Sequence, residues 1–338
     1  MPPSLPHMPV GVPTTCFVSI KDTDDAEEDL TKDEKSVVIQ EPGKDKPKVF
    51  DFKPNNIEEI FDFTLDTPEK IFETMFYDLV KEEQEDVDVP LKTLVHDSCS
   101  ISAFFLGPMN GNKTNYFQGT GENDHGAIGW TAEQIFTLIA EKEESIDGLY
   151  TSNISISFYE LYEEVIIDLL NPENNKLDQP SMDPFFGYKV PGMTVKKCNG
   201  VEDIIAQVEY GRNSRKNQIF STGPAANSSS AIFELILRQE DKDGIAFSRL
   251  LFVEIPGTEK LTLSSDKIRQ AEGPLLSKSL FSFQDVCKTL SLKKQDRFNA
   301  PFEHSVLTKL LHDTLGADSM NLALACIAQG SPKESKVS

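Results

Sequence analysis

Apolar positions in the first half of the chain change from a continuous run to a helical spacing on the two sides of a glycine-containing segment. Ile101-Ser-Ala-Phe-Phe-Leu106 is a short apolar run, which predicts a buried strand. Residues 130–140 carry apolar side chains at helical spacing, which predicts a helix. The segment between them is therefore expected to be a loop that joins a strand to a helix.

That loop is close to the phosphate-binding pattern G-x-x-x-x-G-K-[ST], in which backbone N–H groups surround phosphate oxygens. Gly107, Lys113 and Thr114 are in register, but Asn112 stands at the second glycine. Asparagine tolerates a positive φ, so we expect the turn to survive, although its side chain crowds a close-approaching phosphate. The alternative is a Gly/Asn turn with an incidental lysine. The predicted nucleotide-binding residues are Gly107, Pro108, Met109, Asn110, Gly111, Asn112, Lys113 and Thr114.

Four later segments resemble motifs of the kinesin motor domain, in the same order and at matching separations. The first resembles an E-x-Y-x-E stretch followed by D-L-L, with matches at Glu160, Tyr162, Glu164, Asp168, Leu169 and Leu170. The others are Val253–Glu259, similar to the switch II motif D-L-A-G-S-E; Leu276–Leu280, similar to I-N-K-S-L; and Ser305–Gly316, similar to S-K-L-T-x-L-L-x-D-S-L-G. Together with the loop, they identify residues 14–332 as resembling a diverged kinesin motor domain.

The resemblance implies an α/β fold of the P-loop NTPase type, with a central mixed, mostly parallel sheet and helices on both faces. Asn110 and Phe117-Gln-Gly-Thr120 look most like the mitotic kinesin-like subfamily. We expect residues 1–13 to be a disordered lead-in and residues 333–338 a tail. The family's final helix and neck linker have no counterpart in the sequence given.

Several positions depart from the residues that the resemblance implies for ATP hydrolysis. The switch I motif N-x-x-S-S-R-S-H falls on residues 223–230, where Ser229 matches while Ser228 and Ser230 replace the Arg and the His. In switch II, Glu254 replaces the Asp and Pro256 the Ala, whereas Gly257 and Glu259 are kept. Of the R-x-R-P segment that borders the base in kinesins, only the positive charge of Lys21 survives.

The resemblance therefore assigns catalytic positions to Ser229, Glu254, Gly257 and Glu259, and Mg²⁺ ligands to Thr114 and Ser229. It implies ATP or ADP with Mg²⁺ as cofactors, and Glu259 is expected to lack its usual arginine partner. Misplacing a group by about an ångström can cost on the order of 100-fold in rate. We thus expect a motor domain that hydrolyses ATP slowly or not at all. One alternative is a working microtubule-stimulated ATPase. The other is a protein-interaction module that binds neither tubulin nor nucleotide.

The net charge of the chain affects whether it can bind microtubules, the partner that the resemblance implies. The chain has 338 residues and a formal net charge of −22, which opposes binding to the acidic microtubule surface unless a local basic patch overcomes it. From residue 278 to residue 309 there are six Lys or Arg against three acidic residues, in the region that faces tubulin in kinesins. The predicted microtubule contacts are Lys278, Lys288, Lys293, Lys294, Arg297 and Lys309. A solvated charged segment without a partner is the alternative.

Other partner classes are not indicated. No stretch approaches the ~20 apolar residues that cross a bilayer, and the five cysteines show no C-x-x-C spacing. We expect a protein of the cytoplasm and cytoskeleton that binds neither nucleic acid nor membrane. Oligomeric state, cargo and direction of movement are not encoded in any motif found here.

Overall fold

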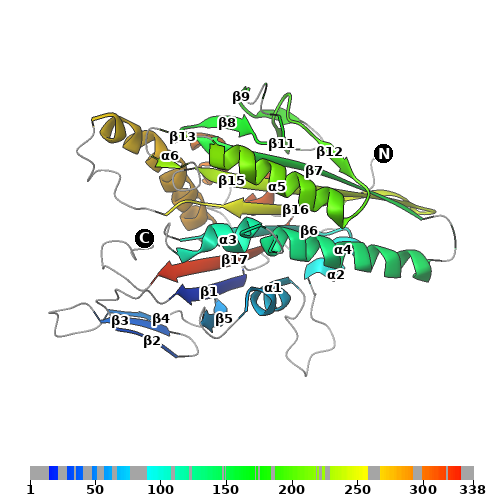
Figure 1. Ribbon diagram of the computed structural model, residues 1–338, viewed down its shortest axis with the longest axis horizontal. Helices are drawn as coiled ribbons and strands as arrows, with labels where there is room; N and C mark the ends of the chain where they lie inside the picture. The colour runs from blue at the N-terminus through cyan, green and yellow to red at the C-terminus, as the bar shows by residue number, and fades with distance from the viewer. Residues whose placement is uncertain are drawn as a thin grey trace.

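A ten-stranded sheet organises the protein, for which we use a computed structural model (Figure 1). The structure describes residues 15–21, 29–33, 36–40, 48–51, 57–62, 67–76, 90–107, 111–121, 124–146, 148, 150–171, 173, 176–183, 187–217, 219–220, 223–224, 229–257, 267–291, 299–316 and 319–328. The predicted lead-in and tail lie outside the described residues, so the predicted domain boundaries stay a prediction.

The central sheet has a defined strand order. Its strands, in spatial order, are β5 (Ile57–Asp62), β1 (Thr15–Lys21), β17 (Ser319–Ala328), β6 (Ser100–Leu106), β16 (Gly244–Glu254), β15 (Ser230–Asp241), β7 (Thr151–Tyr162), β8 (Val165–Asp168) and β9 (Lys176–Leu177), with β12 (Lys196–Cys198) paired to β7. Smaller sheets join β2 (Asp29–Asp33), β3 (Ser36–Gln40) and β4 (Lys48–Asp51); β10 (Ser181–Asp183) and β11 (Gly187–Lys189); and β13 (Ile219–Phe220) and β14 (Gly223–Pro224).

The direction of pairing changes across the central sheet. From β5 to β16 the neighbours are parallel, whereas from β16 to β9 they are antiparallel. The expectation of a mixed sheet is confirmed, but predominantly parallel pairing holds only for the half that contains β6. That parallel half places the carboxyl ends of β6 and β16 next to each other, because Phe105 is paired with Glu254.

Helices cover both faces of the sheet, as expected. They are α1 (Pro68–Phe76), α2 (Pro90–His96), α3 (Lys113–Gln118), α4 (Gly126–Ser145), α5 (Val201–Asn217), α6 (Lys267–Leu290), the 3₁₀ helix η5 (Phe302–His304), α7 (Val306–Leu310) and α8 (His312–Gly316). In Figure 1, α4 and α5 run side by side along the sheet, in agreement with the contacts between them.

Successive side chains of the central strands pack into two hydrophobic cores, one on each face of the sheet. Along β6, Phe105 packs into the core shared with α1 to α5, whereas Phe104 packs into the core shared with α6 and α7. Phe252 and Val253 on β16 divide in the same way. Because successive strand residues point to opposite faces, an apolar run without alternation predicts a strand buried on both sides, as the run at 101–106 does.

Candidate functional site

The loop after β6 keeps the backbone of a tight turn in the part that the structure describes. Gly107 has φ 133°, and a Cβ there would lie 2.1 Å from the carbonyl oxygen of Cys326 on β17, so only glycine fits. Asn112 has φ 67° and ψ 8°, and its side-chain oxygen accepts a hydrogen bond from Asn115 Nδ2 at 2.7 Å. The left-handed conformation expected for Asn112 is therefore present. Residues 108–110 lie outside the described residues.

The helix that follows the loop touches the end of β16. Thr114 Oγ1, in the first turn of α3, donates a hydrogen bond to Glu254 Oε1. Lys113, the preceding residue, is 1% exposed. This contact exists because β6 and β16 are parallel neighbours whose carboxyl ends open on the same edge of the sheet. The structure thus brings together the predicted loop and the predicted switch II residue Glu254.

An arginine that we did not predict as a site residue lies at the centre of this region. Arg215 in α5 is 1% exposed, and its Nη1 lies 2.5 Å from Glu254 Oε2 while its Nε lies 3.3 Å from Glu160 Oε2. Its Nη2 donates to the backbone oxygen and the hydroxyl of Ser229 at 3.2 and 3.3 Å. Ser229 Oγ in turn donates to Glu160 Oε2 at 3.0 Å. We call Thr114, Glu160, Arg215, Ser229 and Glu254 the buried network.

Burial dominates the electrostatics of the buried network. It raises the pKa of Glu160, and the nearby Glu254 carboxylate acts in the same direction. The charge of Arg215 and the hydrogen bonds from Ser229 and Arg215 oppose that rise. A guanidinium shared between two carboxylates is the arrangement that allows buried acids to persist in a folded protein.

The predicted metal ligands, Thr114 and Ser229, both lie in the buried network. Each donates its O–H to a carboxylate, Thr114 to Glu254 and Ser229 to Glu160, so each hydroxyl keeps lone pairs of the kind that Mg²⁺ shares. One acceptor position of the Ser229 hydroxyl is taken by the guanidinium of Arg215. Their role as metal ligands stays a prediction. Among the residues that the structure describes, no group of three or more His, Cys, Asp or Glu could hold a metal ion.

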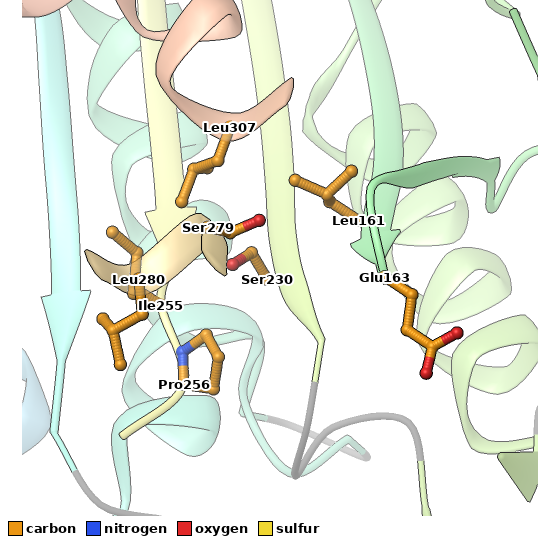
Figure 2. Close-up of a pocket in the computed structure, with 8 residues that line it drawn as sticks. All are labelled: Leu161, Glu163, Ser230, Ile255, Pro256, Ser279, Leu280 and Leu307. Atoms are coloured by element: carbon orange, nitrogen blue, oxygen red, sulfur yellow. The ribbon is translucent and has the colours of Figure 1, made fainter. Parts of the chain in front are cut away.

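A small pocket lies beside the buried network, at the end of β16. Pro256 follows β16 and lines this pocket together with Ser230 at the start of β15 and with Ser279 and Leu280 of α6 (Figure 2). Gly257 is partly exposed next to Pro256. Ser228 and Glu259 lie outside the described residues. The expected loss of the ion pair between Glu259 and the arginine that Ser228 replaces therefore stays a prediction.

The predicted microtubule contacts are only partly described. Lys278 on α6 lies 3.2 Å from Glu164, and Lys309 on α7 lies 3.4 Å from Glu303. Lys288 is exposed. Lys293, Lys294 and Arg297 lie outside the described residues. Two of the expected basic contacts are thus paired with carboxylates of the chain itself.

Glu164 connects three elements at the edge of this region. It lies in the turn between β7 and β8, where Glu163 and Glu164 have φ 50° and 66°. Its carboxylate accepts hydrogen bonds from Ser279 Oγ of α6 and, at 2.9 Å, from the backbone N–H of Val306 of α7. The sequence marked Glu164 as a motif residue, but no local pattern indicated these contacts.

A strand, a glycine loop and a helix, with a carboxylate supplied by the neighbouring parallel strand, define a P-loop nucleotide-binding domain. The family model described as the kinesin motor domain matches residues 24–338, and the chain belongs to that family. The predicted resemblance and fold are confirmed. Kinesin motor domains generally bind ATP or ADP with Mg²⁺.

Relatives of several kinds match most of the chain. The mouse chromosome-associated kinesin KIF4 is 31% identical over 73% of this chain and 21% of its own length, and the mouse kinesin-like protein KIF18A is 25% identical over 77% and 30%. Rice kinesin-like protein KIN-14E is 28% identical over 74% of this chain and 22% of its own length. The chain therefore spans less than a third of the length of these relatives, and its predicted subfamily stays a prediction.

Solved structures show the same fold. A KIF14 fragment, solved as a two-heads-bound dimer with AMP-PNP in complex with a microtubule, superposes with a TM-score of 0.77 at 20% identity and covers 96% of this chain and 90% of that one. A structure described as a fast kinesin gives a TM-score of 0.76 at 20% identity, with coverage of 95% and 86%.

Proposed function

We propose that this chain is a motor domain that binds microtubules and, through the loop at residues 107–114, ATP or ADP, but hydrolyses ATP slowly or not at all. The contact between Thr114 and Glu254 carries the nucleotide part of this proposal. It joins the loop to the switch II segment, which is the connection that a nucleotide-dependent domain of this family needs. We further propose that the protein acts on the cytoskeleton in the cytoplasm.

Weak hydrolysis follows from how the pocket residues are held. Both oxygens of Glu254 are engaged, one by Thr114 and the other by Arg215, and the side chain is fully buried. Phosphoryl transfer depends on positioning and electrostatics rather than on covalent chemistry by the protein. A carboxylate that is longer than aspartate and pinned at both oxygens is poorly placed to organise water around a transferred phosphate.

The microtubule part of the proposal rests on α6 and α7. Among the matched structures, the KIF14 fragments are described in complex with a microtubule. Lys288 remains exposed on α6, and three further predicted contacts lie in the segment after that helix. The Glu partners of Lys278 and Lys309 are themselves partly exposed, so a strongly acidic partner can compete for both lysines.

A second candidate is an interaction module that uses neither tubulin nor nucleotide. The specific observation in its favour is the pairing of Lys278 with Glu164 and of Lys309 with Glu303, which reduces the positive field of this surface. Such a module would bind a partner without dependence on ATP or on low salt.

Microtubule co-sedimentation of the purified chain separates these candidates. It should be run with ADP, with a non-hydrolysable ATP analogue and without nucleotide, across a salt series. We expect binding that weakens with salt and changes with nucleotide. Binding that ignores nucleotide would restrict the proposal to a static microtubule binder, and absence of binding at low salt in all three states would favour the interaction module.

Hydrolysis is tested by restoring the family residues. The triple variant Asn112→Gly, Ser228→Arg, Glu254→Asp is expected to raise microtubule-stimulated ATPase activity above that of the unmodified chain. A variant that keeps the first two changes but retains Glu254 is the matched control for the pinned carboxylate. No gain in the triple variant would mean that these positions do not limit turnover.

A further inference from the structure

The helix α6 carries a large apolar side chain on the face that is turned away from the core. Phe281 is 58% exposed, although Phe283, two residues later, is buried in the core shared with α7. An α-helix turns by about 100° per residue, so these two side chains leave the helix on opposite sides. More than half of the surface of Phe281 therefore stays in contact with water while α6 fills its core with other residues.

Phe281 lies in line with two of the predicted microtubule contacts. Lys278 precedes it by three positions, and Asp285 and Lys288 follow it by four and seven positions, so the four side chains share one face of α6. All four residues are exposed. We call Lys278, Phe281, Asp285 and Lys288 the α6 stripe. Along the helix, the aromatic ring lies between the two lysines.

The charge of the α6 stripe is small for a surface that binds an acidic partner. Two lysines against one aspartate leave a single positive charge, and Lys278 already lies 3.2 Å from Glu164 of the same chain. Attraction between exposed charges contributes little to affinity and weakens as salt increases. An apolar contact does not weaken in this way, because it arises from the removal of apolar surface from water.

We propose that Phe281 is the apolar anchor of the microtubule contact, buried against tubulin between two lysines that face the acidic microtubule surface. The inference rests on the proposed microtubule binding and adds the residue that carries its salt-resistant part. Protein interfaces are enriched in aromatic side chains at their buried centre and polar at their rim, and a few central residues carry most of the affinity. The α6 stripe has this order, with Phe281 at its centre.

Microtubule co-sedimentation of the full chain and of Phe281→Gln tests this, across a salt series and in the nucleotide state that gives the tightest binding. Loss of the apolar contact is expected to weaken binding about tenfold at every salt concentration. Lys288→Gln is expected to weaken binding at low salt and to have little effect at high salt, because screening has then already removed its contribution. Phe281→Leu keeps an apolar side chain and should stay within about threefold of the unmodified chain.

Phe247→Gln is the matched control for the loss of an exposed aromatic ring. Phe247 is 45% exposed but lies on β16, outside the α6 stripe, so its replacement should leave the affinity for microtubules unchanged. Because both phenylalanines are exposed, circular dichroism is expected to show the same folded content in both variants. An equal loss of affinity in Phe247→Gln would contradict a specific role of Phe281.

The remaining outcomes separate the anchor from the proposed function. Equal affinities of Phe281→Gln and the unmodified chain would overturn the anchor while leaving microtubule binding intact, and so would a loss confined to low salt. Dimers of the unmodified chain that dissociate in Phe281→Gln, with unchanged affinity for microtubules, would assign the α6 stripe to self-association instead. Absence of microtubule binding by the unmodified chain would overturn the anchor and the proposed function together.

Discussion

Arg215 forms two ion pairs in a place where water cannot reach either of them. A buried ion pair contributes little net stability when formed, because desolvation offsets most of the attraction, but removing one partner is expensive. Loss of Arg215 would leave Glu160 and Glu254 buried without their counter-ion. The residue is therefore expected to matter for the fold as well as for the pocket.

We predict that Arg215→Met lowers the free energy of unfolding by about 3 to 5 kcal/mol. Urea denaturation followed by circular dichroism measures this change. Arg238→Met is the control, because its ion pair with Glu240 is half-exposed and its loss should cost less than about 1 kcal/mol. Equal effects of the two substitutions would show that the buried network does not stabilise the fold.

Single residues of the site were predictable to different degrees. The positive φ of Asn112 could be expected from the register of the loop, because that pattern requires a left-handed residue there. Arg215 could not be identified in the same way, since its partners lie in β7 and β16 and no local pattern reports contacts between distant segments.

The turn between β7 and β8 is the clearest example of one element controlling others. Two consecutive residues with positive φ, Glu163 and Glu164, make the tight reversal that right-handed strand twist favours. The reversal directs the Glu164 carboxylate toward α6 and the first turn of α7, where it accepts the otherwise unpaired N–H of Val306. The turn thus fixes the two helices proposed to face the microtubule.

Glu164→Gln is expected to lower the free energy of unfolding by about 1 to 3 kcal/mol, because a charged acceptor of several hydrogen bonds is lost. Hydrogen exchange should also accelerate at the amide of Val306, which is 2.9 Å from the Glu164 carboxylate. Glu240→Gln removes an exposed carboxylate of the same sheet and should change neither quantity. Unchanged exchange at Val306 in Glu164→Gln would contradict the role of this contact.

Elements with a strong periodic signal were predictable, and short ones were not. The strand β6 and the helix α4 lie where the apolar run and the helical spacing placed them. A mixed sheet was predicted, but the extent of its antiparallel part was not, because strands buried on both faces have similar sequences whatever the direction of their neighbours. The two-residue strand β9 has too few positions to show any period.

At the scale of the whole molecule, the net charge of −22 opposes binding to an acidic partner, and two of the predicted basic contacts that the structure describes are paired within the chain. Lys278 and Lys309 have carboxylate partners within the chain. The proposed affinity for microtubules therefore depends on Lys288 and on the predicted contacts Lys293, Lys294 and Arg297. None of the described helices is long and apolar enough to cross a membrane.

The cysteine thiols differ in burial and therefore in pKa and reactivity. Burial raises the pKa of Cys198 to about 11 and that of Cys326 to about 12, whereas Cys287 is exposed on α6. Because the thiolate is the reactive form, both buried cysteines should stay protonated and unreactive in the folded protein well above the ordinary thiol pKa of about 8.5. Below that value the folded and unfolded chains bind the same proton, so no pH dependence of stability arises from these thiols there.

We predict that iodoacetamide at about pH 9 modifies Cys287 in the folded protein but not Cys198 or Cys326. Peptide mass mapping gives the extent of labelling at each position, and labelling in urea provides the control in which every thiol reacts. Modification of Cys326 at the rate of Cys287 would mean that the loop at Gly107, which rests on the backbone of Cys326, opens readily.

The charge balance among Lys113, Arg215, Glu160 and Glu254 has a consequence for the protein inside a cell. A ligand that binds only the folded state stabilises it by mass action, so proteins that need nucleotide to complete their interior lose folded population when nucleotide is scarce. Here the interior charges are matched by the chain's own side chains. Nucleotide bound at the proposed loop would then add to the stability of an interior whose charges are already paired, rather than complete that interior.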